Sequence, residues 1–184
     1  MARTIVWNNE NEPGVEKLNL DTKENSIVAK SHVIGGDADL HTKWDAEYEI
    51  TCGANWHVRD VSIYEKTAGR HLIIHSDGAG NWTNESGKEI EVIHGCIDID
   101  FRATPFSNTF PIKRLQLAEG ETATIEVAYI NAPDLEITKE QQVYTRLSSH
   151  TWKFIQPSAD FEATITVDDE GFVVDYPGLF TRAS

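Results

Sequence analysis

Apolar and polar residues alternate with a period of two along most of this chain. Successive side chains of a strand point to opposite faces, so this alternation is typical of strands with one buried face. Turn signals such as Gly35-Gly36-Asp37 separate the alternating segments. The pattern predicts strands over Thr4–Trp7, Glu16–Asp21, Ser26–Ile34, Thr42–Thr51, Trp56–Tyr64, Arg70–His75, Cys96–Ala103, Pro111–Leu117, Thr122–Asn131, Glu136–Thr138, Trp152–Gln156, Phe161–Val167 and Gly171–Asp175. Many short strands at roughly even spacing indicate an antiparallel roll, sandwich or barrel.

Helical signals are few. Thr138–Leu147 carries the strongest one, because Thr138 and Gln141 have the spacing of a capping box. We therefore expect a short helix there, and at most one short turn in the tail after Pro177.

Some predicted strands carry bulk on one face and small or polar residues on the other. In Thr122–Asn131, Ile125, Val127 and Tyr129 share a face with Ala123, and the opposite face is polar and mostly small. Such a sheet either lines a cavity, as in ligand-holding barrels, or presents its mixed face to solvent. If a cavity exists, we expect Trp82, just after the glycine turn at 77–80, near its rim.

Composition narrows the function classes. The chain has 184 residues, of which 40% are hydrophobic and 25% charged, as in a globular protein of one domain spanning 1–184. Its formal net charge of −14 disfavours nucleic-acid binding and anionic membrane surfaces. No run has the length of a signal-peptide core or a membrane span. The two cysteines, Cys52 and Cys96, are too few for a disulfide framework, so we expect free thiols in a cytoplasmic protein.

The segment "GCIDIDFRATPFSNTFPIKRL" (95–115) gathers two acids and three bases around an asparagine-bearing turn. On a strand, Asp98 and Asp100 share a face with Cα atoms roughly 6.5–7 Å apart, and Arg102 continues that face. Arg114 on the next segment could pair with either carboxylate in a bidentate manner, as arginine favours. The cluster is either a structural ion network or the wall of a binding site.

Two kinds of catalytic or metal chemistry compete with a binding role. Paired carboxylates serve glycoside hydrolases, so an enzyme acting on a sugar or small polar substrate through Asp98 and Asp100 is an alternative. Flanking arginines would keep both acids ionised, leaving no proton donor, so we expect no catalytic residues. His71 and His75 share a strand face but lie too far apart for one ion. We accordingly expect no metal and no cofactor.

The same segment resembles the signature block of the putative glycolipid-binding protein family, a bacterial family long labelled as of unknown function. The family block reads GC-x-D-[IVL]-D, then a TP-x-[ST]-N turn, then LPIRRL. Further segments that fit in order are "GVEKL" (14–18), "WHVRDV" (56–61), "SDGAGNW" (76–82), "QQVYTR" (141–146) and "DEGFVVDYPGLF" (169–180). Lys113 and Phe110 depart from the family's usual Arg and Leu. The resemblance implies a single-domain antiparallel β-roll or open barrel with at most one or two short helices, similar to periplasmic lipoprotein carriers and built around a hydrophobic cavity.

These observations predict non-enzymatic binding of an amphiphilic small molecule, a glycolipid or lipid, in an apolar cavity with a charged rim. Arg59 and Arg114 would donate to headgroup oxygens, while Asp98, Asp100 and Asn108 would fix hydroxyls or hold the arginines. The remaining candidates are Tyr129 on the apolar face, Trp82 at the rim, and Tyr144 with Arg146 in the QQVYTR segment. A scaffold without a ligand stays open as a further possibility.

Overall fold

The computed structural model describes residues 2–183. Within them, fourteen strands form one sheet. The strands are β1 (Ala2–Asn9), β2 (Gly14–Thr22), β3 (Ser26–Asp37), β4 (Thr42–Gly53), β5 (Val58–Glu65), β6 (Arg70–Ser76), β7 (Trp82–Asn84), β8 (Asp98–Phe101), β9 (Thr122–Ile130), β10 (Ile137–Arg146), β11 (Thr151–Gln156), β12 (Phe161–Val167), β13 (Val173–Tyr176) and β14 (Phe180–Arg182). The predicted all-β open roll with at most two short helices is confirmed, because one α-helix accompanies these strands in the described residues.

The sheet follows the chain closely. Its order is β7-β6-β5-β4-β3-β2-β1-β14-β13-β12-β11-β10-β9-β8, so β14 joins an N-terminal half to a C-terminal half. Neighbours pair antiparallel except β8 and β9, which are parallel. Short turns suffice for antiparallel pairs of consecutive strands, whereas β1 and β14 pair from opposite ends of the chain, and parallel β8 is connected to β9 through a longer segment that holds the helix.

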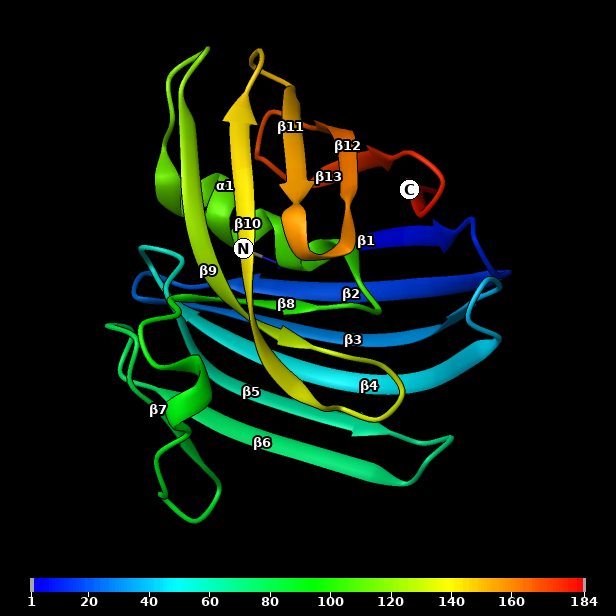
Figure 1. Ribbon diagram of the computed structural model, residues 1–184, viewed down its shortest axis with the longest axis vertical. Helices are drawn as coiled ribbons and strands as arrows, with labels where there is room; N and C mark the ends of the chain where they lie inside the picture. Colours follow the sequence, from blue (N-terminus) through cyan, green and yellow to red (C-terminus); the bar gives the residue numbers. More distant parts are fainter. Residues whose placement is uncertain (1, 184) are drawn as a thin grey trace.

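The two halves of the sheet curl toward each other, and β1–β6 run across the direction of β9–β12 (Figure 1). Between them lie a 3₁₀ turn, Pro105–Asn108, and the helix α1, Thr109–Leu115. Phe110 of α1 packs into the cluster formed mainly by β1–β9, and Ile112 packs into a second cluster against β10–β14. The helix thereby fills part of the interior between the two halves of the sheet.

Alternation explains the inner face of the N-terminal half. Along β4, Trp44, Ala46, Tyr48 and Ile50 are buried while the residues between them are more exposed. Strand β8 differs, because Ile99 and Phe101 on one face are buried, and Asp98 and Asp100 on the other are also enclosed. An edge strand that is covered on both faces needs partners for every charge on it.

The predicted strand Pro111–Leu117 is wrong, because this segment belongs to α1. Pro111 falls in the first turn of the helix, where its missing N–H costs nothing. Gln116 ends the helix with a left-handed φ of 48°. A seven-residue helix is too short to show its own periodicity, and its burial on several sides resembles a strand pattern.

The predicted helix Thr138–Leu147 is also wrong, because these residues form most of β10. This strand pairs with β9 on one side and β11 on the other, and buries Gln142 and Tyr144. Pairing on both edges therefore outweighs the local capping-box signal. The tail likewise adds β14 after Pro177, where only a turn was expected.

Three expectations from composition bear on the fold. Both Cys52 and Cys96 are free and buried. None of the helices in residues 2–183 has the length and apolar character to cross a membrane. The same residues contain no cluster of three or more acidic, histidine or cysteine side chains suited to a metal ion.

Candidate ligand-binding site

A pocket of about 550 Å³ opens between the two halves of the sheet. This volume lies within the ~300–1,000 Å³ typical of small-molecule sites. Both halves of the sheet and the 3₁₀ turn contribute. The lining residues are Asn9, Asn11, Gly36, Asp37, Asp39, Trp44, Asp100, Arg102, Thr104, Asn108, Tyr129, Phe154, Gln156, Ala159, Phe161, Tyr176, Pro177, Gly178, Leu179 and Phe180.

One wall of the pocket is aromatic. Phe154, Phe161, Tyr176 and Phe180 come from β11, β12, β13 and β14 and pack edge to face or tilted, with ring centroids 6.1–6.3 Å apart. These contacts hold the rings in fixed orientations, and buried aromatic pairs contribute about 0.5–1.5 kcal/mol each beyond their area. The wall can therefore pack against an apolar surface without rearranging.

The opposite wall is polar and comes from β8 and the segments beside it. Arg102 forms an ion pair with Asp37 of β3 and donates to Asn131 Oδ1 at 3.2 Å. The guanidinium also lies over the Trp44 ring, 5.9 Å from its centroid. Arg102 is thus fixed by a carboxylate, an amide and a ring face at the edge of the pocket.

Asp100 begins a chain of buried hydrogen bonds behind the polar wall. Its Oδ2 accepts from Gln142 Nε2 at 2.6 Å, and Tyr144 Oη lies 3.5 Å from Gln142 Oε1. Asn108 Nδ2 then donates to Tyr144 Oη at 2.9 Å. This chain connects two residues of the pocket lining through two residues that stand behind it.

Burial raises the pKa of Asp100 to about 6, and the hydrogen bond from Gln142 opposes that shift. Burial, with Asp100 as the next cause, also raises the pKa of Tyr129 to about 12 and places that of Tyr144 well above its usual range. At neutral pH the pocket consequently offers an ionised carboxylate beside neutral phenols.

Asp98 and Arg114 form the bidentate pair that the sequence predicts. Arg114 Nε lies 3.1 Å from both carboxylate oxygens and Nη2 lies 2.7 Å from Oδ2. Burial raises the pKa of fully buried Asp98, while Arg114 opposes that shift. Because Asp98 is held by Arg114 and Asp100 by Gln142, the geometry does not support the two carboxylates acting together as an enzyme on one sugar.

The structure brings some predicted site residues together and separates others. Asp100, Asn108 and Tyr129 line one pocket, Tyr144 stands directly behind it, and the Asp98–Arg114 pair fixes the same strand. The other three predicted residues are engaged elsewhere. Arg59 donates to the Asp77 carbonyl, Trp82 to the Cys96 carbonyl, and Arg146 to the carbonyls of Leu117 and Ser148.

Sequence reasoning missed a buried acid next to the pocket. Glu16 is 2% exposed, and its Oε1 accepts from Tyr48 Oη at 2.6 Å and Ser31 Oγ at 2.8 Å. Tyr48 Oη also lies 3.3 Å from Thr104 Oγ1, which lines the pocket and caps the 3₁₀ turn through Phe106 N. Burial raises the pKa of Glu16 to about 7, and these hydroxyl groups oppose the shift.

Sequence reasoning also missed Trp44 and the aromatic wall. For the buried cluster around Glu16 the sequence did carry a signal, because this acid occupies an inward position of the alternating strand β2. Nothing comparable marked the aromatic wall, because its rings come from four different strands and look like core residues in sequence.

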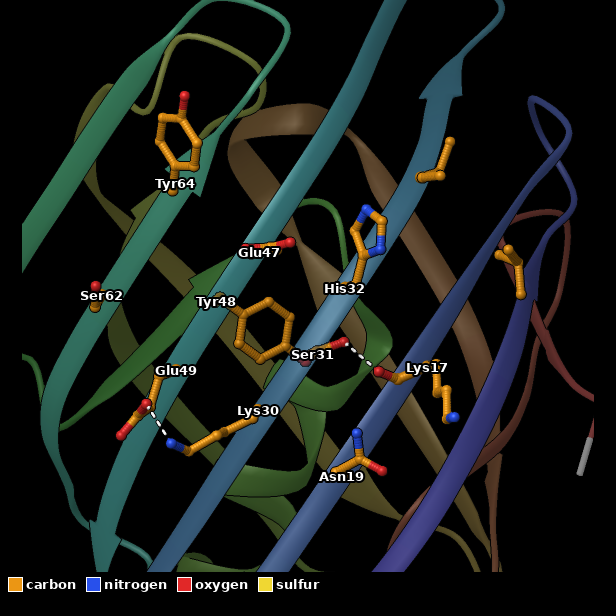
Figure 2. Close-up of a pocket in the computed structure, with 12 residues that line it drawn as sticks. Lys17, Asn19, Lys30, Ser31, His32, Glu47, Tyr48, Glu49, Ser62 and Tyr64 are labelled. Atoms are coloured by element: carbon orange, nitrogen blue, oxygen red, sulfur yellow. Dashed lines mark hydrogen bonds and ion pairs between the residues drawn. The ribbon is translucent and has the colours of Figure 1, made fainter.

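A second hollow, of about 540 Å³, lies on the outer face of β2–β5 (Figure 2). Its long side chains project from neighbouring strands, and Lys30 pairs with Glu49 at 2.9 Å. Lys17, His32 and Glu47 are also exposed there. The outer hollow is lined by solvent-exposed charges of both signs. The inner pocket is therefore the better candidate for a ligand-binding site.

Comparison with known proteins agrees with this architecture. The family model described as "Putative glycolipid-binding" matches residues 4–182. A crystal structure of a DUF1089 family protein from Pseudomonas aeruginosa is 35% identical, with a TM-score of 0.80 and coverage of 91% of each chain. A search among curated proteins found no match. Because the family model spans nearly the whole chain, this protein belongs to the "Putative glycolipid-binding" family.

Proposed function

We propose that this protein binds an amphiphilic small molecule, a glycolipid, without chemically changing it, in the pocket between the two halves of the sheet. One observation carries the proposal: a fixed aromatic wall and a fixed polar wall face the same space of about 550 Å³. The description of the family supports it.

The polar headgroup would lie against β8. Asp100 accepts hydrogen bonds from ligand hydroxyl groups, and Asn108 and the Arg102–Asp37 pair form the sides of the same region. Because these groups are already held by protein partners, little side-chain entropy is lost on binding. Tyr144 contributes indirectly, since it holds Asn108 in place.

The apolar part of the ligand would lie along Phe154, Phe161, Tyr176 and Phe180. Each CH₂ group removed from water there contributes about 0.8 kcal/mol. In this arrangement the charged groups form one wall of the pocket and the aromatic rings form another.

The other predicted residues take different roles in this proposal. The Asp98–Arg114 pair supports β8, whereas Arg59, Trp82 and Arg146, which were expected to bind the ligand, lie outside the pocket lining and donate to backbone carbonyls. One domain spanning 1–184 handles the ligand, and the two free thiols support a cytoplasmic setting.

Lipid capture tests the proposal. The purified protein is incubated with a bacterial lipid extract, re-isolated and analysed by mass spectrometry of its bound lipids. We expect a sugar-bearing amphiphile to be enriched over a similarly acidic control protein. Phe161→Ser, in the aromatic wall, should lose it, whereas Tyr64→Ser, an exposed aromatic on the outer face, should retain it.

Two outcomes would count against it. Recovery of no lipid above the control protein contradicts binding. Turnover of a glycoside panel that disappears in folded Asp100→Asn contradicts the non-enzymatic part and favours the alternative of an enzyme.

A further inference from the structure

The pocket contains a buried donor that has no partner. Trp44 is 3% exposed and lines the pocket, and its Nε1 finds no hydrogen-bond acceptor among the described residues. A buried N–H without a partner has given up its hydrogen bonds to water and gained none in return, which destabilises the folded state. An acceptor supplied by a ligand would remove that cost.

Gly35, the register partner of Trp44 on β3, lies beside this donor. A Cβ on Gly35 would come within 3.1 Å of Trp44 Nε1 and within 2.7 Å of Asn9 Nδ2. Asn9 is held there, because it donates to the Gly36 carbonyl at 3.1 Å. Asn9, Gly36 and Trp44 all line the pocket, so the backbone at Gly35 lies beside it, and a side chain at Gly35 would crowd the indole N–H.

The charges around the pocket are unbalanced. Asp37, Asp39 and Asp100 supply three carboxylates against the one guanidinium of Arg102, so the lining carries two formal negative charges. Asp37 already neutralises Arg102. A ligand anion would therefore meet uncompensated carboxylates and no free cation within the described lining.

Resting on the proposed function, we propose that the pocket selects an uncharged, hydroxyl-rich headgroup, one of whose oxygen atoms accepts from Trp44 Nε1 beside Gly35, and rejects phosphate and sulfate headgroups. Hydroxyl groups serve both kinds of partner, because they donate to Asp100 and Asp39 and accept from the indole. A phosphate accepts only and keeps its negative charge next to those carboxylates.

Three octyl amphiphiles that differ only in the headgroup test the selectivity. Isothermal titration at pH 7.5, below the critical micelle concentrations, compares octyl glucoside, octyl phosphate and octylamine. We expect octyl glucoside to bind at least about tenfold more tightly than octyl phosphate. Equal or tighter binding of octyl phosphate overturns the selectivity and leaves the binding function standing. Tighter binding of octylamine than of octyl glucoside overturns the proposed preference for an uncharged headgroup. No binding of any of the three overturns the proposed function and this inference together.

Trp44→Phe tests the hydrogen bond itself. The variant keeps an aromatic ring but lacks the indole N–H, so octyl glucoside affinity should fall about two- to tenfold, as for one hydrogen bond. The smaller ring leaves a cavity at a buried position and should lower the melting temperature, so affinities are compared at a temperature where both proteins are folded. Trp56→Phe, outside the pocket lining, is the matched control. Unchanged affinity in folded Trp44→Phe overturns the role of Trp44.

Asp39→Asn tests the charge argument. Removing this carboxylate should reduce the ratio of octyl glucoside affinity to octyl phosphate affinity severalfold. The control is Glu49→Gln on the outer face, which changes the net charge by the same amount and should leave this affinity ratio unchanged. An equal effect of both substitutions would assign the selectivity to net charge and overturn the local explanation.

Discussion

Arg114 holds both carboxylate oxygens of Asp98, joining the helix α1 to strand β8 inside the curled sheet. Asp98 is fully buried, and the Arg114 side chain is 19% exposed. This pair lets β8, an edge strand enclosed by the curled sheet, carry an acid on a face that does not reach water.

Removing one partner of this pair should destabilise the protein strongly. Arg114→Met leaves Asp98 buried without compensation, so we expect a loss of about 3–5 kcal/mol in the free energy of unfolding, measured in urea. Arg114→Lys should lie in between, because lysine lacks the planar fork. The double variant Asp98→Asn/Arg114→Met should be more stable than Arg114→Met alone. Arg70→Met, at an exposed position, is the control, and an equal loss there would contradict the argument.

Glu16 should make stability depend on pH. Burial raises the pKa of Glu16 in the folded state to about 7, above its ordinary value of about 4.5, so the folded state binds the proton more tightly than the unfolded state. This contribution is fully present below pH 4.5 and is lost as pH rises through about 7, amounting to about 3 kcal/mol. Glu16→Gln should show a shallower decline between pH 5 and 8 in urea titrations. Parallel pH profiles for the two proteins would show that Glu16 does not titrate in this range.

Tyr144 should contribute to stability through its hydroxyl group. Tyr144→Phe leaves the buried amide of Asn108 without its acceptor, so we expect a loss of about 1–3 kcal/mol in the free energy of unfolding. Tyr64→Phe removes a hydroxyl from a 43% exposed side chain and should change stability by less than about 0.5 kcal/mol. A loss in Tyr144→Phe as small as in this control would mean that the hydrogen bond contributes nothing.

Gly80, in the "SDGAGNW" segment, should resist substitution for a reason of space. A Cβ there would lie 2.8 Å from Gly95 Cα at a φ of 98°, whereas a Cβ on Gly69, at a φ of 62°, meets nothing within 4 Å. Gly69→Ala should cost about 1–2 kcal/mol from backbone strain alone, and Gly80→Ala should cost more because of the clash. Thermal unfolding of both variants gives the comparison. Equal losses would rule out the close approach of the two glycines.

Alternation in the sequence determines most of the sheet, because a strand buried on one face must place apolar residues at every second position. The long strands β2–β6 follow the predicted segments closely for that reason. The acids of β8 and the arginine of the next segment could likewise be paired from sequence, since a buried carboxylate needs a cation or donors. The segments that resemble the family's motifs predict the β-roll fold itself.

Only the tertiary structure decided which segment is the helix and which polar groups meet. Thr138–Leu147 becomes a strand because both of its edges find partners, and Pro111 enters a helix because that helix is buried between two halves of a sheet. The aromatic wall and the free indole N–H of Trp44 come together from strands far apart in the chain. Such a convergence depends on how the sheet curls, and curling is a property of packing between distant elements that no local pattern of residues records.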